Sequence, residues 1–115
     1  MESQRQIRYG ELIRSIISDC LIKEDFYNED INLTSVTVSF VRMSKDLKIA
    51  NVYFMPLGGK NKLDVLNSLK KVSGRIKKII SDNISLRQTP KLYFKIDETF
   101  EYAQNIQKIL EKIKK

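Results

Sequence analysis

The first pattern along the chain is a run of apolar residues with helical spacing between charged flanks. The apolar positions recur at intervals of three and four: Ile13, Ile16, Ile17, Cys20 and Leu21. This spacing predicts an amphipathic helix over residues 5–23, with Cys20 as a buried packing residue. Residues 24–32 are acidic and polar, so we expect a loop there.

An alternation with a period of two follows over residues 33–43. Val36, Val38 and Phe40 fall on one face of this segment, and Thr37 and Ser39 fall on the other. This alternation predicts a strand. A short polar connection, residues 44–46, leads to a second segment of branched and aromatic residues over positions 49–55. The two segments therefore predict a β-hairpin.

Helical spacing returns over residues 64–83, after Asn61, which is a candidate N-cap. Asp64 follows in the first turn, where a negative charge is favoured by the helix dipole. Ser73 and Gly74 interrupt the middle of this segment, and glycine costs about 1 kcal/mol relative to alanine inside a helix. We therefore expect two helices joined at Gly74.

A third strand and a last helix complete the predicted elements. After Pro90, the apolar residues Leu92, Phe94 and Ile96 alternate with polar positions, and Thr99 is placed to cap a last helix. The predicted order is α-β-β-α-α-β-α. It implies a single α+β domain over residues 1–115, with a three-stranded sheet packed by helices on one face.

Composition removes several classes of function. No apolar run approaches the roughly 20 residues of a membrane span, and no signal-peptide core is present, so we expect a cytoplasmic protein without a membrane partner. The chain has no histidine, which removes the usual general base and the commonest metal ligand. Its carboxylates form no paired or ligand-spaced cluster. We therefore expect no enzyme activity, no catalytic residue, no metal and no cofactor.

The net charge of +7 is concentrated in one segment. Residues 60–91 contain nine basic and two acidic residues, so the rest of the chain is neutral overall. Such a segment suits a polyanion, because lysine and arginine replace counterions on phosphates. Lys71, Arg75 and Lys78 are spaced by four and three and share one helix face. A helix that began after Gly74 would also offer free backbone N–H groups to a phosphate.

These features together predict a nucleic-acid-binding surface around the glycine. The predicted RNA-binding residues are Lys70, Lys71, Ser73, Gly74, Arg75, Lys77, Lys78 and Arg87. The order of elements also matches the prokaryotic KH module, which clamps single-stranded nucleic acid with a GxxG loop between two helices. GxxG itself is missing, and Val72, Ser73 and Gly74 stand in its place.

Three stretches of the chain resemble the ribosome-binding factor A family. Residues 41–53 are similar to the family pattern V-x-x-S-x-D-L-x-x-A-x-V-Y, and residues 86–97 are similar to L-R-x-x-P-x-L-x-F-x-x-D. Between them, Val72, Ser73 and Gly74 occupy the place of the family's interhelical kink, A-x-G. Val72 replaces the usual alanine there, so the approach of the two helices or the kink geometry is open to change. As a second departure, residues 28–30 stand where many members carry D-P-R.

The resemblance implies a fold and a function. The fold is a KH-like type II domain, α-β-β-α-α-β with a C-terminal helix. The function is that of a non-catalytic monomer that binds the free 30S small ribosomal subunit and assists late maturation and processing of 16S rRNA, including growth at low temperature.

Other interpretations of the sequence stay open. A general KH-type single-stranded RNA-binding protein is the nearest alternative, followed by a basic adaptor that works through protein contacts, and then by an enzyme. Ser44 and Asp46 are expected to form a turn rather than to contact a ligand. Tyr53, Tyr93 and Phe94 are expected in the core, with base stacking as the less favoured alternative.

Overall fold

The computed structural model describes residues 2–23, 36–56 and 61–99. They form α1 (Gln4–Lys23), β1 (Val36–Met43), β2 (Ile49–Pro56), α2 (Lys62–Asn83) and β3 (Lys91–Ile96). The predicted loop at residues 24–32, the D-P-R position at 28–30 and the body of the predicted last helix lie outside the described residues. The α+β class is confirmed.

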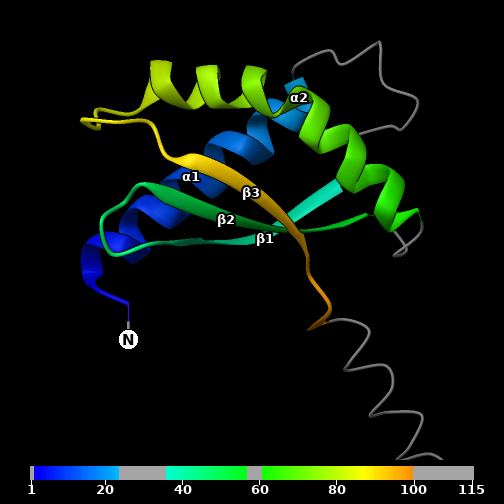
Figure 1. Ribbon diagram of the computed structural model, residues 1–115, viewed down its shortest axis with the longest axis horizontal. Coiled ribbons are helices and arrows are strands. Elements are labelled where there is room, and N and C mark those ends of the chain that lie inside the picture. The colour runs from blue at the N-terminus through cyan, green and yellow to red at the C-terminus, as the bar shows by residue number, and fades with distance from the viewer. Residues whose placement is uncertain (1, 24–35, 57–60, 100–115) are drawn as a thin grey trace, which may run out of the picture.

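The three strands form one sheet in the order β1-β2-β3. β1 and β2 pair antiparallel as the predicted hairpin, and β2 and β3 pair parallel, so α2 is the crossover between them (Figure 1). α1 packs against β1, α2 packs against β3, and the two helices contact each other. The prediction of a sheet packed by helices on one face is therefore confirmed.

The core lies between the sheet and the two helices. Ile13 and Ile17 of α1, Val52 and Phe54 of β2 and Ile76 of α2 are all fully buried in one continuous cluster. Cys20 is buried in the same cluster, as its place on the apolar stripe predicted. Burial of this apolar surface is the main force that holds the helices on the sheet.

The start of α1 is fixed by a reciprocal capping box. The backbone N–H of Ser3 donates to Oε1 of Gln6 (2.8 Å), and the backbone N–H of Gln6 donates to Oγ of Ser3 (3.1 Å). Nε2 of Gln6 also donates to the carbonyl oxygen of Met43 at the end of β1 (3.0 Å). This buried amide therefore caps the helix and joins it to the sheet.

The prediction that Phe40 shares a strand face with Val36 and Val38 is wrong, because β1 contains a β-bulge. The register with β2 shifts between Val38 and Phe40, where Ser39 is the extra residue. One extra residue reverses the alternation that follows. Val36, Val38 and Val41 therefore face the core, whereas Phe40 turns to the opposite face of the sheet and is only half-buried.

The prediction of two helices joined at Gly74 is also wrong. α2 is a single helix through that position, because its buried positions stay in phase on both sides: Val65, Ser68, Leu69, Val72, Ile76 and Ile80. Their burial outweighs the small helix penalty of one glycine. Figure 1 shows the axis of α2 changing direction near its middle.

The predicted cap of α2 is wrong in its chemistry. Asn61 precedes the helix in the left-handed conformation (φ 59°), and its side chain makes no capping hydrogen bond. Its carbonyl oxygen instead accepts the first helical bond, from the backbone N–H of Val65 (2.9 Å). Asparagine tolerates this backbone conformation better than most residues, which accounts for its presence there. Asp64 lies in the first turn as predicted.

Candidate nucleic-acid interface

The cations predicted from the sequence lie on the solvent-facing side of α2. Five of them make up what we call the α2 basic surface: Lys70, Lys71, Arg75, Lys77 and Lys78. All five are exposed, whereas the isoleucines of the same helix face the core. Within residues 2–23, 36–56 and 61–99, Lys70, Lys71, Lys77 and Lys78 form no ion pair. Their charge is therefore available to a polyanion.

Gly74 lies in the middle of this surface, with cations around it. Lys70 and Lys77 stand four residues before it and three after it, so they share its helix face. A Cβ atom at Gly74 would meet nothing within 4 Å. The glycine therefore leaves a low point among long basic side chains, and no packing contact with the described residues requires it.

The predicted kink residues occupy different sides of α2. Val72 is buried in the core, and Gly74 is exposed. Ser73 is half-buried, and its hydroxyl donates to the carbonyl oxygen of Lys70 (2.8 Å). Such back-bonding within a helix is a common cause of bending. The assignment of a kink to these three residues stays a prediction.

One element of the predicted phosphate site is absent from α2. Because the helix runs through Gly74 without a break, the backbone N–H groups that follow the glycine are inside the helix. Interior N–H groups donate to carbonyl oxygens of the preceding turn and are not free to bind phosphate. Any binding by the α2 basic surface must therefore come from side chains.

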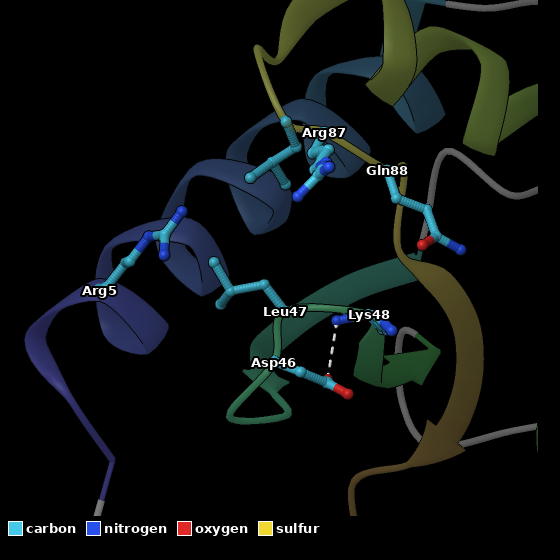
Figure 2. A pocket seen from close by; sticks show the side chains of 7 residues that line it. Arg5, Asp46, Leu47, Lys48, Arg87 and Gln88 are labelled. Carbon is cyan, nitrogen blue, oxygen red and sulfur yellow. Dashed lines mark hydrogen bonds between the residues drawn. The ribbon is translucent and has the colours of Figure 1, made fainter.

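Arg87 lies apart from the α2 basic surface. It follows the end of α2 and lines an open groove of about 820 Å³, which we call the hairpin groove. The groove is lined by Arg5, Asp46, Leu47, Lys48, Leu86, Arg87 and Gln88. In Figure 2, Arg5 of α1 and Arg87 point toward the same opening, with Leu47 between them. Gly74 and the end of α2 at Asn83 are nine residues apart, or about 14 Å of helix.

The hairpin turn that forms one wall of this groove is held by the side chains of Ser44 and Asp46. The Ser44 hydroxyl donates to Oδ1 of Asp46 (2.6 Å), which also accepts the backbone N–H of Lys48 (3.1 Å). The Ser44 hydroxyl in turn accepts the backbone N–H of Ile49 (3.1 Å). Leu47, between Asp46 and Lys48, adopts a positive φ of 60°. Ser44 and Asp46 are therefore turn formers, as predicted.

The same hydrogen bonds act on the Asp46 carboxylate. The Ser44 hydroxyl and the Lys48 backbone N–H lower the pKa of Asp46 from its ordinary value, because both stabilise the charged form. The carboxylate is therefore ionised when it holds the turn, and among the described residues it is the one acidic side chain that lines the groove.

The groove joins two stretches that are far apart in the sequence. Asp46 and Lys48 belong to residues 41–53, and Arg87 belongs to residues 86–97, the two segments with the most specific sequence patterns. The backbone N–H of Lys91 donates to the carbonyl oxygen of Lys48 (2.8 Å), which holds the segments together. Sequence reasoning did not identify Arg5 and Lys48, because their proximity to Arg87 arises only in the folded chain.

The three strand aromatics divide between the two faces of the sheet. Phe94 is 7% exposed and belongs to the core, as predicted. Tyr53 and Tyr93 instead occupy outward positions, where Tyr93 is 42% exposed and Tyr53 is half-buried. The expectation that all three are core residues is therefore wrong for the tyrosines.

The described parts of the chain contain neither a metal site nor a membrane-spanning helix. Over residues 2–23, 36–56 and 61–99, no group of three or more acidic, cysteine or histidine side chains is placed to hold a metal ion. Neither α1 nor α2 combines the length and the apolar character that a membrane crossing requires.

Comparison with known proteins identifies relatives of the chain. A family model described as ribosome-binding factor A matches residues 5–110. The ribosome-binding factor A of Ruegeria pomeroyi is 40% identical over 109 residues, which cover 95% of this chain and 83% of that protein.

Solved structures show the same fold. The crystal structure of ribosome-binding factor A from Thermus thermophilus superposes with a TM-score of 0.67 at 18% identity, covering 79% of this chain and 93% of that one. A Thermus thermophilus homology model fitted into a cryo-electron microscopy map of a complex with the 30S subunit gives a TM-score of 0.56 at 24% identity, covering 75% and 92%. The family model and the Ruegeria relative each span most of this sequence, so the chain belongs to the ribosome-binding factor A family.

Proposed function

We propose that the chain binds the free 30S small ribosomal subunit and assists late maturation and processing of 16S rRNA, including growth at low temperature. Membership of the ribosome-binding factor A family supports this function, as does the 30S complex of the Thermus thermophilus protein. We further infer that the protein acts as a single-domain cytoplasmic monomer that binds without catalysing a reaction.

The α2 basic surface is the observation that carries this proposal. Its five exposed cations lie along one helix, and the backbone N–H groups between them are engaged within the helix. Affinity then comes from lysine and arginine contacts with phosphates, which carry no sequence information by themselves. Recognition of the subunit therefore depends on the shape that the folded rRNA presents to the protein.

The hairpin groove supports a second contact with phosphate. Arg5, Lys48 and Arg87 come from three different segments and line one opening, beside the carboxylate of Asp46. Arg87 was predicted to bind RNA, and in the structure it would do so together with these neighbours rather than with α2. The protein would then contact rRNA at two places, which favours a large folded partner over a short oligonucleotide.

Sedimentation through a sucrose gradient tests the proposal. Tagged protein in bacterial lysate is expected to travel with free small subunits and to be absent from assembled ribosomes. Absence from every ribosomal fraction would overturn the proposal. Tight binding of short single-stranded oligonucleotides in that case would favour the general KH-type RNA-binding protein.

A further inference from the structure

The face of the sheet turned away from α1 and α2 carries one aromatic ring on each strand. Phe40 of β1, Tyr53 of β2 and Tyr93 of β3 all occupy outward positions. Phe40 reaches this face only because the β-bulge reverses the alternation of β1. We call the outer sheet face the set formed by Phe40, Arg42, Asn51, Tyr53, Lys91, Tyr93 and Lys95.

Two of the rings stack across neighbouring strands, and the third lies diagonally beside them. Phe40 stacks on Tyr53 with ring centroids 4.3 Å apart and an interplanar angle of 19°. Asn51 of β2 lies opposite Tyr93 in the register with β3, so Tyr53 and Tyr93 are diagonal neighbours. Strand spacing and rise per residue place their Cα atoms about 8 Å apart.

Each ring has a cation beside it. The guanidinium of Arg42 lies 5.5 Å from the centroid of Phe40. The ammonium of Lys95 lies 5.9 Å from the centroid of Tyr53, and that of Lys91 lies 5.4 Å from the centroid of Tyr93. These contacts place each cation over the face of a ring, from which a stacking base would displace it.

No outward position of β1, β2 or β3 carries an acidic side chain. The carboxylate of Glu2, which precedes α1, approaches Nε of Arg42 (3.5 Å). Asp97, just after β3, accepts a hydrogen bond from the backbone N–H of Thr99 (3.0 Å). The described outer sheet face is thus aromatic and cationic. The acidic residues Glu2 and Asp97 belong to segments outside the strands.

We propose that the outer sheet face stacks the bases of single-stranded RNA. Every base has a π-face that can stack on an aromatic ring. A stacked base binds the ring more strongly than an exposed cation does, so a base can replace the cation there. Arg42, Lys91 and Lys95 would then contact the phosphates next to the stacked bases. The cations and the lack of strand acids favour RNA over a protein partner.

This inference rests on the proposed function, because the RNA would be an unpaired segment of the same rRNA. Bases inside a duplex already stack on one another and do not expose their π-faces, so the outer sheet face selects single strands. It lies on the opposite side of the sheet from the α2 basic surface. The protein would thereby hold two segments of rRNA on two sides of its sheet.

Two variants and one matched control test the outer sheet face by equilibrium binding to purified free 30S subunits. Tyr93→Thr and Tyr53→Thr each remove a ring and retain strand propensity. Ile49→Thr removes a 37% exposed apolar side chain from an outward position of β2 that has no ring. Since Tyr53 also packs on Phe40, thermal unfolding is measured for each variant, and Tyr93→Thr is the variant that disturbs packing least.

We expect binding to the subunit to weaken roughly tenfold for each ring removed, which is typical of a base-aromatic stack. The salt dependence of binding stays unchanged because no charge is removed. Ile49→Thr binds as the wild type does. Wild-type affinity for folded Tyr93→Thr would overturn the inference while leaving the proposed function intact.

Ultraviolet cross-linking of the wild-type complex distinguishes RNA from protein as the occupant. The expected result is a nucleotide adduct on the peptide that contains Tyr53 or Tyr93. Weakened binding by the variants, together with nucleotide adducts on other peptides alone, would assign the outer sheet face to a ribosomal protein and overturn the inference. Failure of the wild-type protein to bind subunits at all would overturn the proposed function itself.

Discussion

At the scale of the residue, two glycines in helices have opposite structural roles. A Cβ atom at Gly10 of α1 would lie 2.5 Å from the carbonyl oxygen of Val41 in β1, whereas one at Gly74 of α2 would meet open space. Gly10 therefore permits the close approach of α1 to the sheet. Helix spacing alone does not distinguish the two positions, because the difference comes from a neighbouring strand.

Gly10→Ala is expected to destabilise the protein in spite of the better helix propensity of alanine. The methyl group meets a backbone oxygen that cannot rotate away, so α1 must shift from β1. We expect a loss of roughly 1–3 kcal/mol in the free energy of unfolding, typical of overpacking in a core. Denaturant unfolding measures this loss, and a variant as stable as the wild type would contradict the packing of α1 on β1.

The hairpin turn illustrates what residue types alone can predict. Short polar side chains bond their own backbone, so Ser44 and Asp46 could be recognised as turn formers from the sequence. The capping box of Ser3 and Gln6 has an equally local signal, because its two residues are three positions apart. The bond from Gln6 to Met43 has none, because its partner is 37 residues away.

At the scale of the element, α2 shows that tertiary packing can outweigh local propensity. The glycine in its middle predicted a break, but the buried stripe is continuous from Val65 to Ile80 and the helix follows it. The β-bulge of β1 is a structural feature that the local sequence pattern does not predict. The period-two pattern around Ser39 contains no sign of an extra residue, so the reversed face of Phe40 could not be predicted.

Gly74→Ala tests whether α2 is as regular as its hydrogen bonds indicate. The position is exposed and a Cβ atom has room, so alanine is expected to stabilise the protein by about 0.5–1 kcal/mol through its helix propensity. Thermal unfolding of the variant measures the gain. A loss of stability would show instead that the change of direction in α2 requires a glycine backbone.

Binding by the same variant separates structure from function. Gly74 makes no contact that a methyl group would break, so any weakening of subunit binding in a stabilised variant must come from the surface itself. Such a result would mean that RNA approaches the helix backbone at the low point between Lys70 and Lys77.

At the scale of the whole molecule, the cations that we assign to RNA contacts fall on three surfaces: the α2 basic surface, the hairpin groove and the outer sheet face. The first could be predicted because its residues are adjacent on one helix. The hairpin groove and the outer sheet face could not, since Arg5, Lys48 and Arg87 meet only through folding, and the outer sheet face depends on strand register. The α+β class followed from periodicity alone.

The most direct test of the central claim is the salt dependence of binding to free 30S subunits. Lys77→Glu with Lys78→Glu reverses two cations of the α2 basic surface, and Arg8→Glu with Lys23→Glu makes the same charge change at exposed positions of α1. Thermal unfolding is measured for both double variants, so that a loss of binding is not confused with a loss of folding.

We expect the α2 variant to bind more weakly at moderate salt. Its slope of log affinity against log salt should be smaller by about 1.5, because two phosphate contacts are lost. The α1 variant is expected to keep the wild-type slope. An α2 variant with the wild-type slope and affinity would contradict the claim that this helix binds the rRNA of the small subunit.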